Sequence, residues 1–127
     1  MQAMSPEIDR RKYPRYCCRL PAFLNERKIQ VSLCDLSLGG CFIEAPKEKL
    51  LPRGTKVNLV LSLPCVGPLS VTGIVLHHGT PARLGMGVEF IYFPRRLHLV
   101  YAKFVKIFPI LEEARKLYQR LGSTARR

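Results

Sequence analysis

Short apolar segments, separated by turn-forming residues, fill the chain from residue 16 to about residue 93. Six of these segments carry the β-branched and aromatic residues that are typical of strands: 17–24, 28–36, 41–45, 55–63, 69–77 and 83–90. In the fourth segment, Val57, Leu59 and Leu61 alternate with residues that are more polar on average, which predicts a strand with one face more deeply buried. Six short strands at this spacing predict an antiparallel barrel or sandwich and not a parallel α/β sheet.

The apolar pattern changes its period near residue 95. Apolar residues then recur at alternating steps of four and three, as on one face of a helix: Leu97, Tyr101, Phe104, Phe108 and Leu111. Pro109 has no N–H and clashes with the carbonyl of Val105, so we expect the helix to break near it. A second helix would start at Pro109 and end at Gly122, with an apolar face formed by Leu111, Ala114, Leu117, Tyr118 and Leu121.

These patterns predict one domain with flanking segments in a chain of 127 residues. The expected fold class is an all-β core with C-terminal helices, that is, a six-stranded antiparallel barrel plus a helical tail. We expect a flexible lead-in over 1–9, a barrel with a basic N-terminal arm over 10–94, a helical extension over 95–122 that is broken near Pro109, and a disordered tail over 123–127.

The sequence predicts a cytoplasmic protein with no transmembrane segment. No apolar run approaches the roughly 20 residues that cross a bilayer. The first eleven residues lack the apolar core and cleavage site of a secretory signal. The five cysteines are odd in number and form no CxxC pair, so we expect free thiols, most of them buried.

The formal net charge of +12 predicts an anionic partner. Nucleic acid, an acidic membrane surface, a nucleotide and an acidic protein all fit, and the charge alone does not choose among them. Six residues near the start, 10–15, include four of the cations. Pro14 disfavours a helix at Tyr13, so this run should be extended, with its cations spread apart.

Two short motifs narrow the choice of ligand. The first is Arg11-x-x-x-Arg15, which Arg10 directly precedes, and the second is Asp35-x-Ser37-x-x-Gly40. An arginine fork pairs with phosphate oxygens or with the O6/N7 edge of guanine. An ionised aspartate accepts from the N1–H and N2–H₂ donors of guanine, and a serine hydroxyl can donate or accept. The adjacent glycines permit a tight turn that a ligand can approach. Together the motifs suit a guanine nucleotide with phosphates.

At these residues the sequence resembles the PilZ domain family. The family signatures RxxxR and [D/N]xSxxG stand intact as Arg11/Arg15 and Asp35/Ser37/Gly40. The segment 84–90 is similar to the closing GxGVxF-type strand of the family, and the resemblance covers approximately residues 9–93. It implies a six-stranded barrel, in a bacterial signalling protein, that binds the second messenger cyclic di-GMP.

The resemblance also implies roles for individual residues. Arg11 and Arg15 would clamp phosphates and guanine edges, Asp35 and Ser37 would read a guanine, and Gly40 would shape the turn. Arg10 favours two ligand molecules per chain, because family members with an arginine at this place tend to take up an intercalated pair. The ligand would order the basic arm, and an unidentified downstream protein would recognise the changed surface.

Several alternatives stay open or are disfavoured. A basic arm alone would be an ordinary solvated tail, and Asp35 and Ser37 could serve only as turn residues. The helical tail either packs over an open end of the barrel or, beyond Pro109, mediates self-association as a homodimer or docks on a partner.

Other classes of function fit less well. A nucleic-acid-binding small β-barrel fits the charge, but the strands lack a series of aromatics for base stacking, so no DNA partner is expected. A ligand-free PilZ-type interaction scaffold fits poorly with complete motifs. His77, His78 and His98 have no metal-ligand spacing, so neither a metal nor a cofactor is expected. No nucleophile motif suggests an enzyme.

Overall fold

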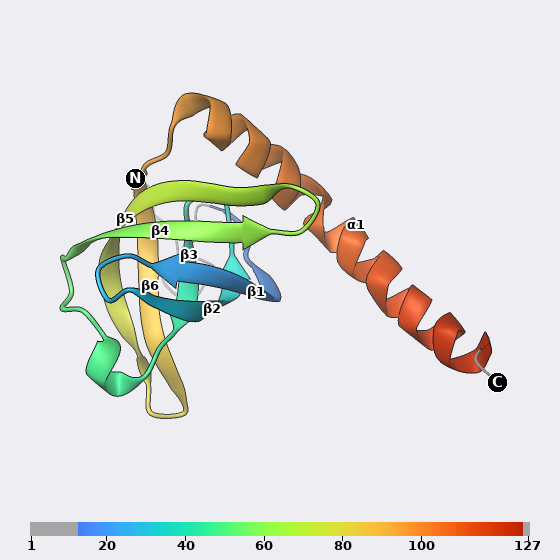
Figure 1. Ribbon diagram of the computed structural model, residues 1–127, viewed down its shortest axis with the longest axis horizontal. Coiled ribbons are helices and arrows are strands. Elements are labelled where there is room, and N and C mark those ends of the chain that lie inside the picture. Colours follow the sequence, from blue (N-terminus) through green and yellow to red (C-terminus); the bar gives the residue numbers. More distant parts are fainter. Residues whose placement is uncertain (1–12, 126–127) are drawn as a thin grey trace, which may run out of the picture.

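Six strands form one closed antiparallel barrel, and a long helix follows it (Figure 1). The computed structural model describes residues 13–125 and the side chains as far as Gly122. The elements in chain order are β1 (Tyr16–Leu24), β2 (Ile29–Leu36), β3 (Gly40–Glu44), the 3₁₀ turn η1 (Lys47–Lys49), β4 (Lys56–Leu63), β5 (Gly67–Thr80), β6 (Arg83–Tyr92) and α1 (Arg95–Ala125). The order around the barrel is β1-β2-β3-β6-β5-β4, and β1 pairs with β4 to close it. The expected six-stranded antiparallel barrel is confirmed.

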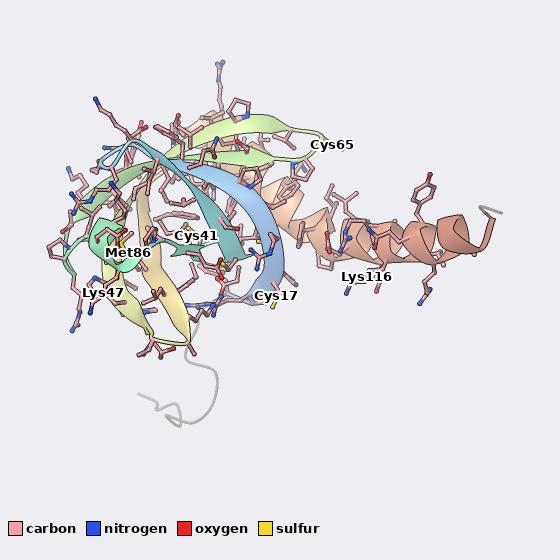
Figure 2. The ribbon with its side chains drawn as sticks, turned by 60° about the horizontal axis from the view of Figure 1, so that its bottom comes forward. Cys17, Cys41, Lys47, Cys65, Met86 and Lys116 are labelled. Carbon is pink, nitrogen blue, oxygen red and sulfur yellow. The ribbon has the colours of Figure 1, made fainter. Side chains whose placement is uncertain are left out.

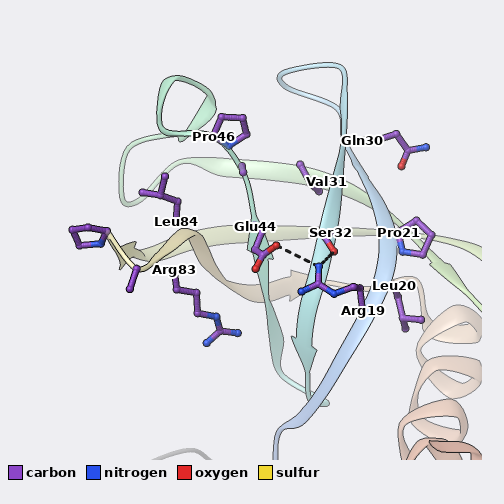
Figure 3. A pocket seen from close by; sticks show the side chains of 13 residues that line it. Arg19, Leu20, Pro21, Gln30, Val31, Ser32, Glu44, Pro46, Arg83 and Leu84 are labelled. Atoms are coloured by element: carbon purple, nitrogen blue, oxygen red, sulfur yellow. Dashed lines mark hydrogen bonds and ion pairs between the residues drawn. The ribbon is translucent and has the colours of Figure 1, made fainter. Parts of the chain in front are cut away.

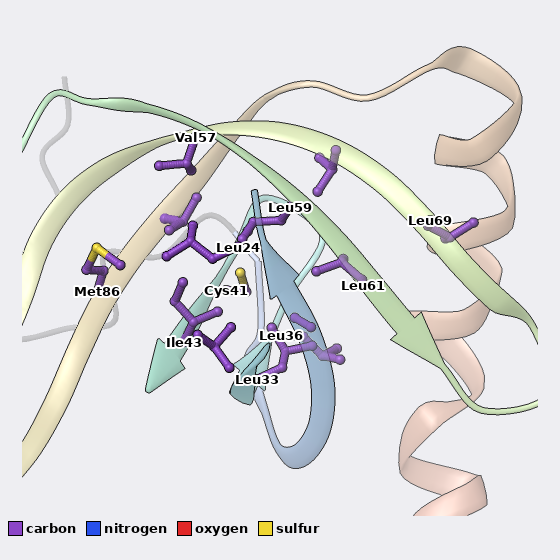
Figure 4. Close-up of a cluster of buried hydrophobic side chains, with 14 of the residues drawn as sticks. Leu24, Leu33, Leu36, Cys41, Ile43, Val57, Leu59, Leu61, Leu69 and Met86 are labelled. Atoms are coloured by element: carbon purple, nitrogen blue, oxygen red, sulfur yellow. The ribbon is translucent and has the colours of Figure 1, made fainter. Parts of the chain in front are cut away.

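Alternating side chains of the strands fill the barrel interior (Figure 4). In β4, the three residues predicted to face inward, Val57, Leu59 and Leu61, are fully buried. Branched and long apolar side chains from the other strands meet them in one cluster: Leu24, Leu33, Ile43, Val75 and Met86. Burial of this apolar surface is the main stabilising contribution to the barrel. It also gives the outer face of the strands a rigid support.

One continuous helix follows the barrel, so the expected break near Pro109 and the expected second helix are wrong. Proline removes a single backbone hydrogen bond, and burial of Phe104 and Phe108 against the barrel core stabilises the turn that contains it. The expected end at Gly122 is also wrong, because Gly122 lacks the positive φ of a C-cap glycine and the helix continues to Ala125. No helix in the described part of the chain has the length and apolar character needed to cross a membrane.

The N-terminal part of α1 packs on the barrel, and the C-terminal part extends away from it (Figures 1 and 2). Tyr101, Phe104, Val105 and Phe108 are buried in the same cluster as the strand residues. This stretch therefore has the packing role that one of the two alternatives for the tail predicts. Lys116 lies on the extended part of the helix.

The five cysteines are free thiols. Cys17 and Cys65 are exposed at the surface, whereas Cys41 lies inside the barrel (Figure 2). Burial, and secondarily the negative charge of Asp35, raises the pKa of Cys18 to about 12. Burial likewise raises the pKa of Cys41 far above its ordinary value. These two thiols therefore stay protonated at neutral pH and pack as small apolar groups.

Candidate functional site

The end of β2 places the acidic residue of the second motif. Asp35 lies one residue before β2 ends at Leu36. The register between β2 and β3 shifts between Leu33 and Asp35, so Cys34 is an extra residue that forms a β-bulge. A bulge re-aims the side chains beside it, and Asp35 here pairs with Phe42 of β3. Asp35 is buried, with 7% of its surface exposed.

Two arginines that are far apart in the sequence surround the carboxylate of Asp35. Arg83, at the start of β6, donates from Nη2 to Oδ2 over 3.3 Å, and Nη1 of Arg15 lies 3.9 Å from the same oxygen. The other oxygen, Oδ1, is buried and accepts no hydrogen bond from the described residues. A buried acceptor without a donor costs free energy, so this oxygen favours a bound group that brings one.

Ser37 and Gly40 close a tight turn between β2 and β3. The N–H of Ser37 donates to the carbonyl of Gly40 over 2.9 Å, and the Ser37 hydroxyl donates to the same carbonyl over 3.3 Å. The N–H of Gly39 donates to Oγ of Ser37 over 3.3 Å. A Cβ on Gly40 would lie 2.3 Å from the carbonyl oxygen of Val88, so this position accepts only glycine against β6. The turn is therefore fixed by its own bonds and by the barrel.

The structure brings together four of the six residues predicted from the motifs: Arg15, Asp35, Ser37 and Gly40. Arg10 and Arg11 lie outside the described residues. The described chain starts at Tyr13, whose ring lies 3.0 Å from the place of a Cβ on Gly39. The segment that leads into β1 therefore passes directly beside the turn.

An aromatic side chain supports Arg83. The guanidinium carbon of Arg83 lies 4.2 Å from the centroid of the Phe42 ring, a distance at which cation and ring attract each other. The imidazole of His77 stacks on the same ring, with centroids 6.3 Å apart. Gly79 and Gly85 make room for the ring, because a Cβ on either would lie less than 3 Å from it. Phe42 and Asp35 thus both contact the guanidinium of Arg83 and fix its position.

An open groove of about 820 Å³ adjoins this arginine (Figure 3). Residues of β1, β2, the end of β3 and the β5–β6 turn line it, with Arg83 among them. Arg19 donates to Oγ of Ser32 over 3.3 Å and lies 3.5 Å from a carboxylate oxygen of Glu44. Figure 3 shows Arg83 on the other side of Glu44. Both arginines are well exposed, so water screens these contacts and an anion can compete for them.

Comparison with known proteins decides which family this barrel and turn represent. The family model of the PilZ domain matches residues 9–102, which is most of the chain. The chain belongs to the PilZ domain family. No curated protein matches this PilZ domain in sequence.

Solved structures share the fold of this PilZ domain. The inhibitor of motility MotI/DgrA from Bacillus subtilis superposes with a TM-score of 0.71 at 16% identity, over 81% of this chain and 52% of that one. The complex of MrkH from K. pneumonia with c-di-GMP superposes with a TM-score of 0.66 at 21% identity, over 86% of this chain and 56% of MrkH. The PilZ domain of YcgR from Escherichia coli, with c-di-GMP, superposes with a TM-score of 0.61 at 16% identity, over 87% of this chain and 98% of the YcgR domain. This chain therefore spans only about half the length of MotI and MrkH, but nearly all of the YcgR domain.

Motif analysis of this PilZ domain missed Arg83 and its support, Phe42 and His77. Arg83 is 48 positions from Asp35 in the sequence, and only the pairing of β3 with β6 brings the two together. A usable signal was present, because Arg83 directly precedes the segment that resembles the closing strand of the family. The sequence suggests no role for His77 other than that of a metal ligand, whereas in the structure its imidazole stacks on the Phe42 ring. The described residues contain no group of three or more His, Cys, Asp or Glu side chains that could hold a metal.

Tyr101 connects α1 directly to the motif turn. Its hydroxyl donates to the carbonyl of Ser37 over 2.6 Å, and its side chain is fully buried. Burial raises the pKa of Tyr101 far above its ordinary value, so the hydroxyl keeps the proton that it donates. The turn therefore depends on the helix as well as on the strands.

We expect Tyr101→Phe to lower the free energy of unfolding by about 1–3 kcal/mol, because it leaves the buried Ser37 carbonyl without this donor. Denaturant unfolding measures the change. Tyr118→Phe is the matched control, since Tyr118 is 76% exposed on the same helix and should change stability by less than about 0.5 kcal/mol. Equal stability of the two variants would mean that this hydrogen bond does not hold the turn.

Proposed function

We propose that this PilZ domain is a receptor for cyclic di-GMP and has no catalytic role. The observation that carries the proposal is the buried carboxylate of Asp35, which lies between two arginines and has one oxygen that accepts no hydrogen bond from residues 13–122. Guanine offers two adjacent N–H donors that suit such a carboxylate. The phosphodiesters of the ligand suit the arginines that surround it. The c-di-GMP complexes of MrkH and YcgR, which share this fold, support the same assignment.

Each residue of the site has a proposed part in binding. Asp35 accepts from a guanine, Arg15 and Arg11 bind phosphate or a guanine edge, and Ser37 and Gly40 hold the turn that the base approaches. Arg83 adds a further cation, since its guanidinium already lies against Asp35 and borders the groove. Arg10 would allow an intercalated pair of ligand molecules.

Signalling follows from ordering of the basic arm in this proposal. Several cations close together repel one another, and two bound phosphates remove that repulsion. Charge-assisted hydrogen bonds then offset the entropy lost when the arm becomes ordered. The new surface would be recognised by a downstream protein in the cytoplasm. Self-association of α1 would be a separate property.

Titration calorimetry with cyclic di-GMP tests the proposal, because it reports affinity and stoichiometry together. We expect tight binding by the wild type, at least a hundredfold weaker binding by Arg15→Ala, and no comparable response to GTP or cyclic di-AMP. Arg27→Ala is the matched control: Arg27 lies in the β1–β2 turn, at the opposite end of β2 from Asp35, and donates to the backbone of η1 and Leu50.

Two outcomes would contradict the proposal. Unchanged affinity in Arg15→Ala would show that this arginine does not clamp the ligand. Absence of binding to cyclic di-GMP, together with salt-dependent binding to short DNA or RNA, would favour a nucleic-acid-binding barrel instead.

A further inference from the structure

The C-terminal part of α1 projects beyond the barrel (Figures 1 and 2). An exposed apolar stripe runs along α1 from Ile107 to Leu121. Five large apolar side chains between residues 107 and 121 are exposed by 46% to 76% of their surface: Ile107, Ile110, Leu117, Tyr118 and Leu121. A helix that is surrounded by water exposes few large apolar side chains, so five within fifteen positions are typical of a protein interface.

The stripe lies on a different side of the helix from the residues that pack on the barrel. Each residue turns an α-helix by about 100°. Around the helix axis, the mean direction of the buried residues Tyr101, Phe104 and Phe108 is therefore roughly a third of a turn from that of the stripe. Packing of α1 on its own barrel thus leaves the stripe open to a partner.

The spacing of the stripe matches a second helix. Four of these residues and the small residue Ala114 follow one another in steps of three and four, as do positions a and d of a heptad: Ile107, Ile110, Ala114, Leu117 and Leu121. Tyr118 lies beside them at position e. The small side chain of Ala114 at the centre lets two helix backbones approach closely. Pro109 falls at position c, on the outer side, where its ring does not obstruct a partner.

Charges beside the stripe select both the partner and its direction. Glu113 and Arg120 occupy the g positions that lie between Ile107 and Leu121. In an antiparallel pair of identical helices, with Ala114 opposite Leu117, position g faces position g, so each Glu113 meets the Arg120 of the second copy. In a parallel pair, position g faces position e, and Glu113 would face Tyr118 without a countercharge. The antiparallel pair therefore brings opposite charges together on both sides of the seam, which the parallel pair does not.

We propose that this stripe binds the same stripe of a second copy of the chain, with the two helices antiparallel. The contact is two-fold symmetric and therefore closes as a dimer. Two heptads make a short seam, so we expect dissociation in the micromolar range of concentration. The proposal does not depend on cyclic di-GMP, because none of the residues of the stripe belongs to the ligand site.

Sedimentation equilibrium of the full chain without ligand tests the dimer. The weight-average mass should rise from monomer toward dimer across the micromolar range. The double variant Ile110→Glu/Leu117→Glu should stay monomeric at every concentration, with the thermal unfolding of the barrel unchanged. A monomeric wild type would overturn the proposal, and so would a double variant that still dimerises.

A charge exchange tests the direction. Glu113→Arg and Arg120→Glu should each raise the dissociation constant roughly tenfold, because each turns two attractive pairs into repulsive ones. The double exchange should restore the wild-type value. Lys116→Glu, which makes the same charge change as Arg120→Glu at an outward c position, is the matched control and should have little effect. If the double exchange dimerised as weakly as the single variants, the antiparallel arrangement would be overturned.

Discussion

Asp35→Ala is expected to lower the affinity for cyclic di-GMP at least a hundredfold while leaving the barrel at least as stable as the wild type. In the proposed complex Asp35 accepts two charge-assisted hydrogen bonds from guanine, and the loss of both, at about 1.5–3 kcal/mol each, accounts for the expected effect. Stability is spared because the carboxylate is buried and one of its oxygens has no donor within the part of the chain that the structure describes, and burial of such a charge is unfavourable. The side chains of Arg83 and Arg15 are 47% and 37% exposed, so water can solvate them once the carboxylate is gone.

Calorimetry and denaturant unfolding of the same Asp35→Ala preparation separate the two effects. Asp35→Asn is the matched control for shape: its amide oxygen still accepts one donor, so binding should fall less than in the alanine variant. A large loss of folding stability in Asp35→Ala would contradict this account, because it would assign Asp35 a structural role. If Asp35→Ala bound cyclic di-GMP as tightly as the wild type, Asp35 would not be part of the ligand site.

The strands could be predicted closely because each has one face in the barrel core. In β4 the alternation of Val57, Leu59 and Leu61 follows directly from the period of two of a strand. The two strands flanking the β5–β6 turn are longer than expected, since β5 runs to Thr80 and β6 to Tyr92. Polar residues near that turn, such as His77 and His78, pair in the ladder without contributing to the core pattern.

The helix could be predicted only in part, because the local cost of Pro109 does not by itself decide whether the helix breaks. Both Pro109 and Gly122 lie inside α1, where each residue type raises the free energy of the helix without excluding it. At Pro109, burial of Phe104 and Phe108 offsets this cost. That burial depends on the barrel surface, which the local sequence does not contain. Tertiary packing therefore decided this element.

The candidate site shows the same division between local and distant information. The turn at Ser37 and Gly40 could be predicted, since its bonds span only a few residues. The place of Arg83 could not, because its contacts with Asp35 and Phe42 arise from strand order around the barrel. Motifs indicate which residues bind a ligand when those residues are neighbours in sequence, and the fold supplies the rest.

Gly40→Ala is expected to lower the free energy of unfolding by about 2–4 kcal/mol, among the largest effects of any single methyl group in this chain. Its Cβ would lie 2.3 Å from the carbonyl oxygen of Val88, which is backbone and cannot rotate away. Gly40 pairs with Glu89 in the β3–β6 ladder, so the strands must separate locally to admit the methyl group. The motif glycine is therefore required by the barrel, whether or not a ligand is present.

Two other glycines provide graded controls in the same denaturant unfolding experiment. A Cβ on Gly39 would lie 3.0 Å from the Tyr13 ring, a side chain that can shift, so Gly39→Ala should cost clearly less. A Cβ on Gly122 would contact nothing within 4 Å, and Gly122→Ala should stabilise α1 by about 0.5–1 kcal/mol, because alanine favours a helix. If Gly40→Ala were as stable as Gly39→Ala, the close contact with β6 would not fix the motif turn, and Gly40 would then be needed only for approach of the ligand.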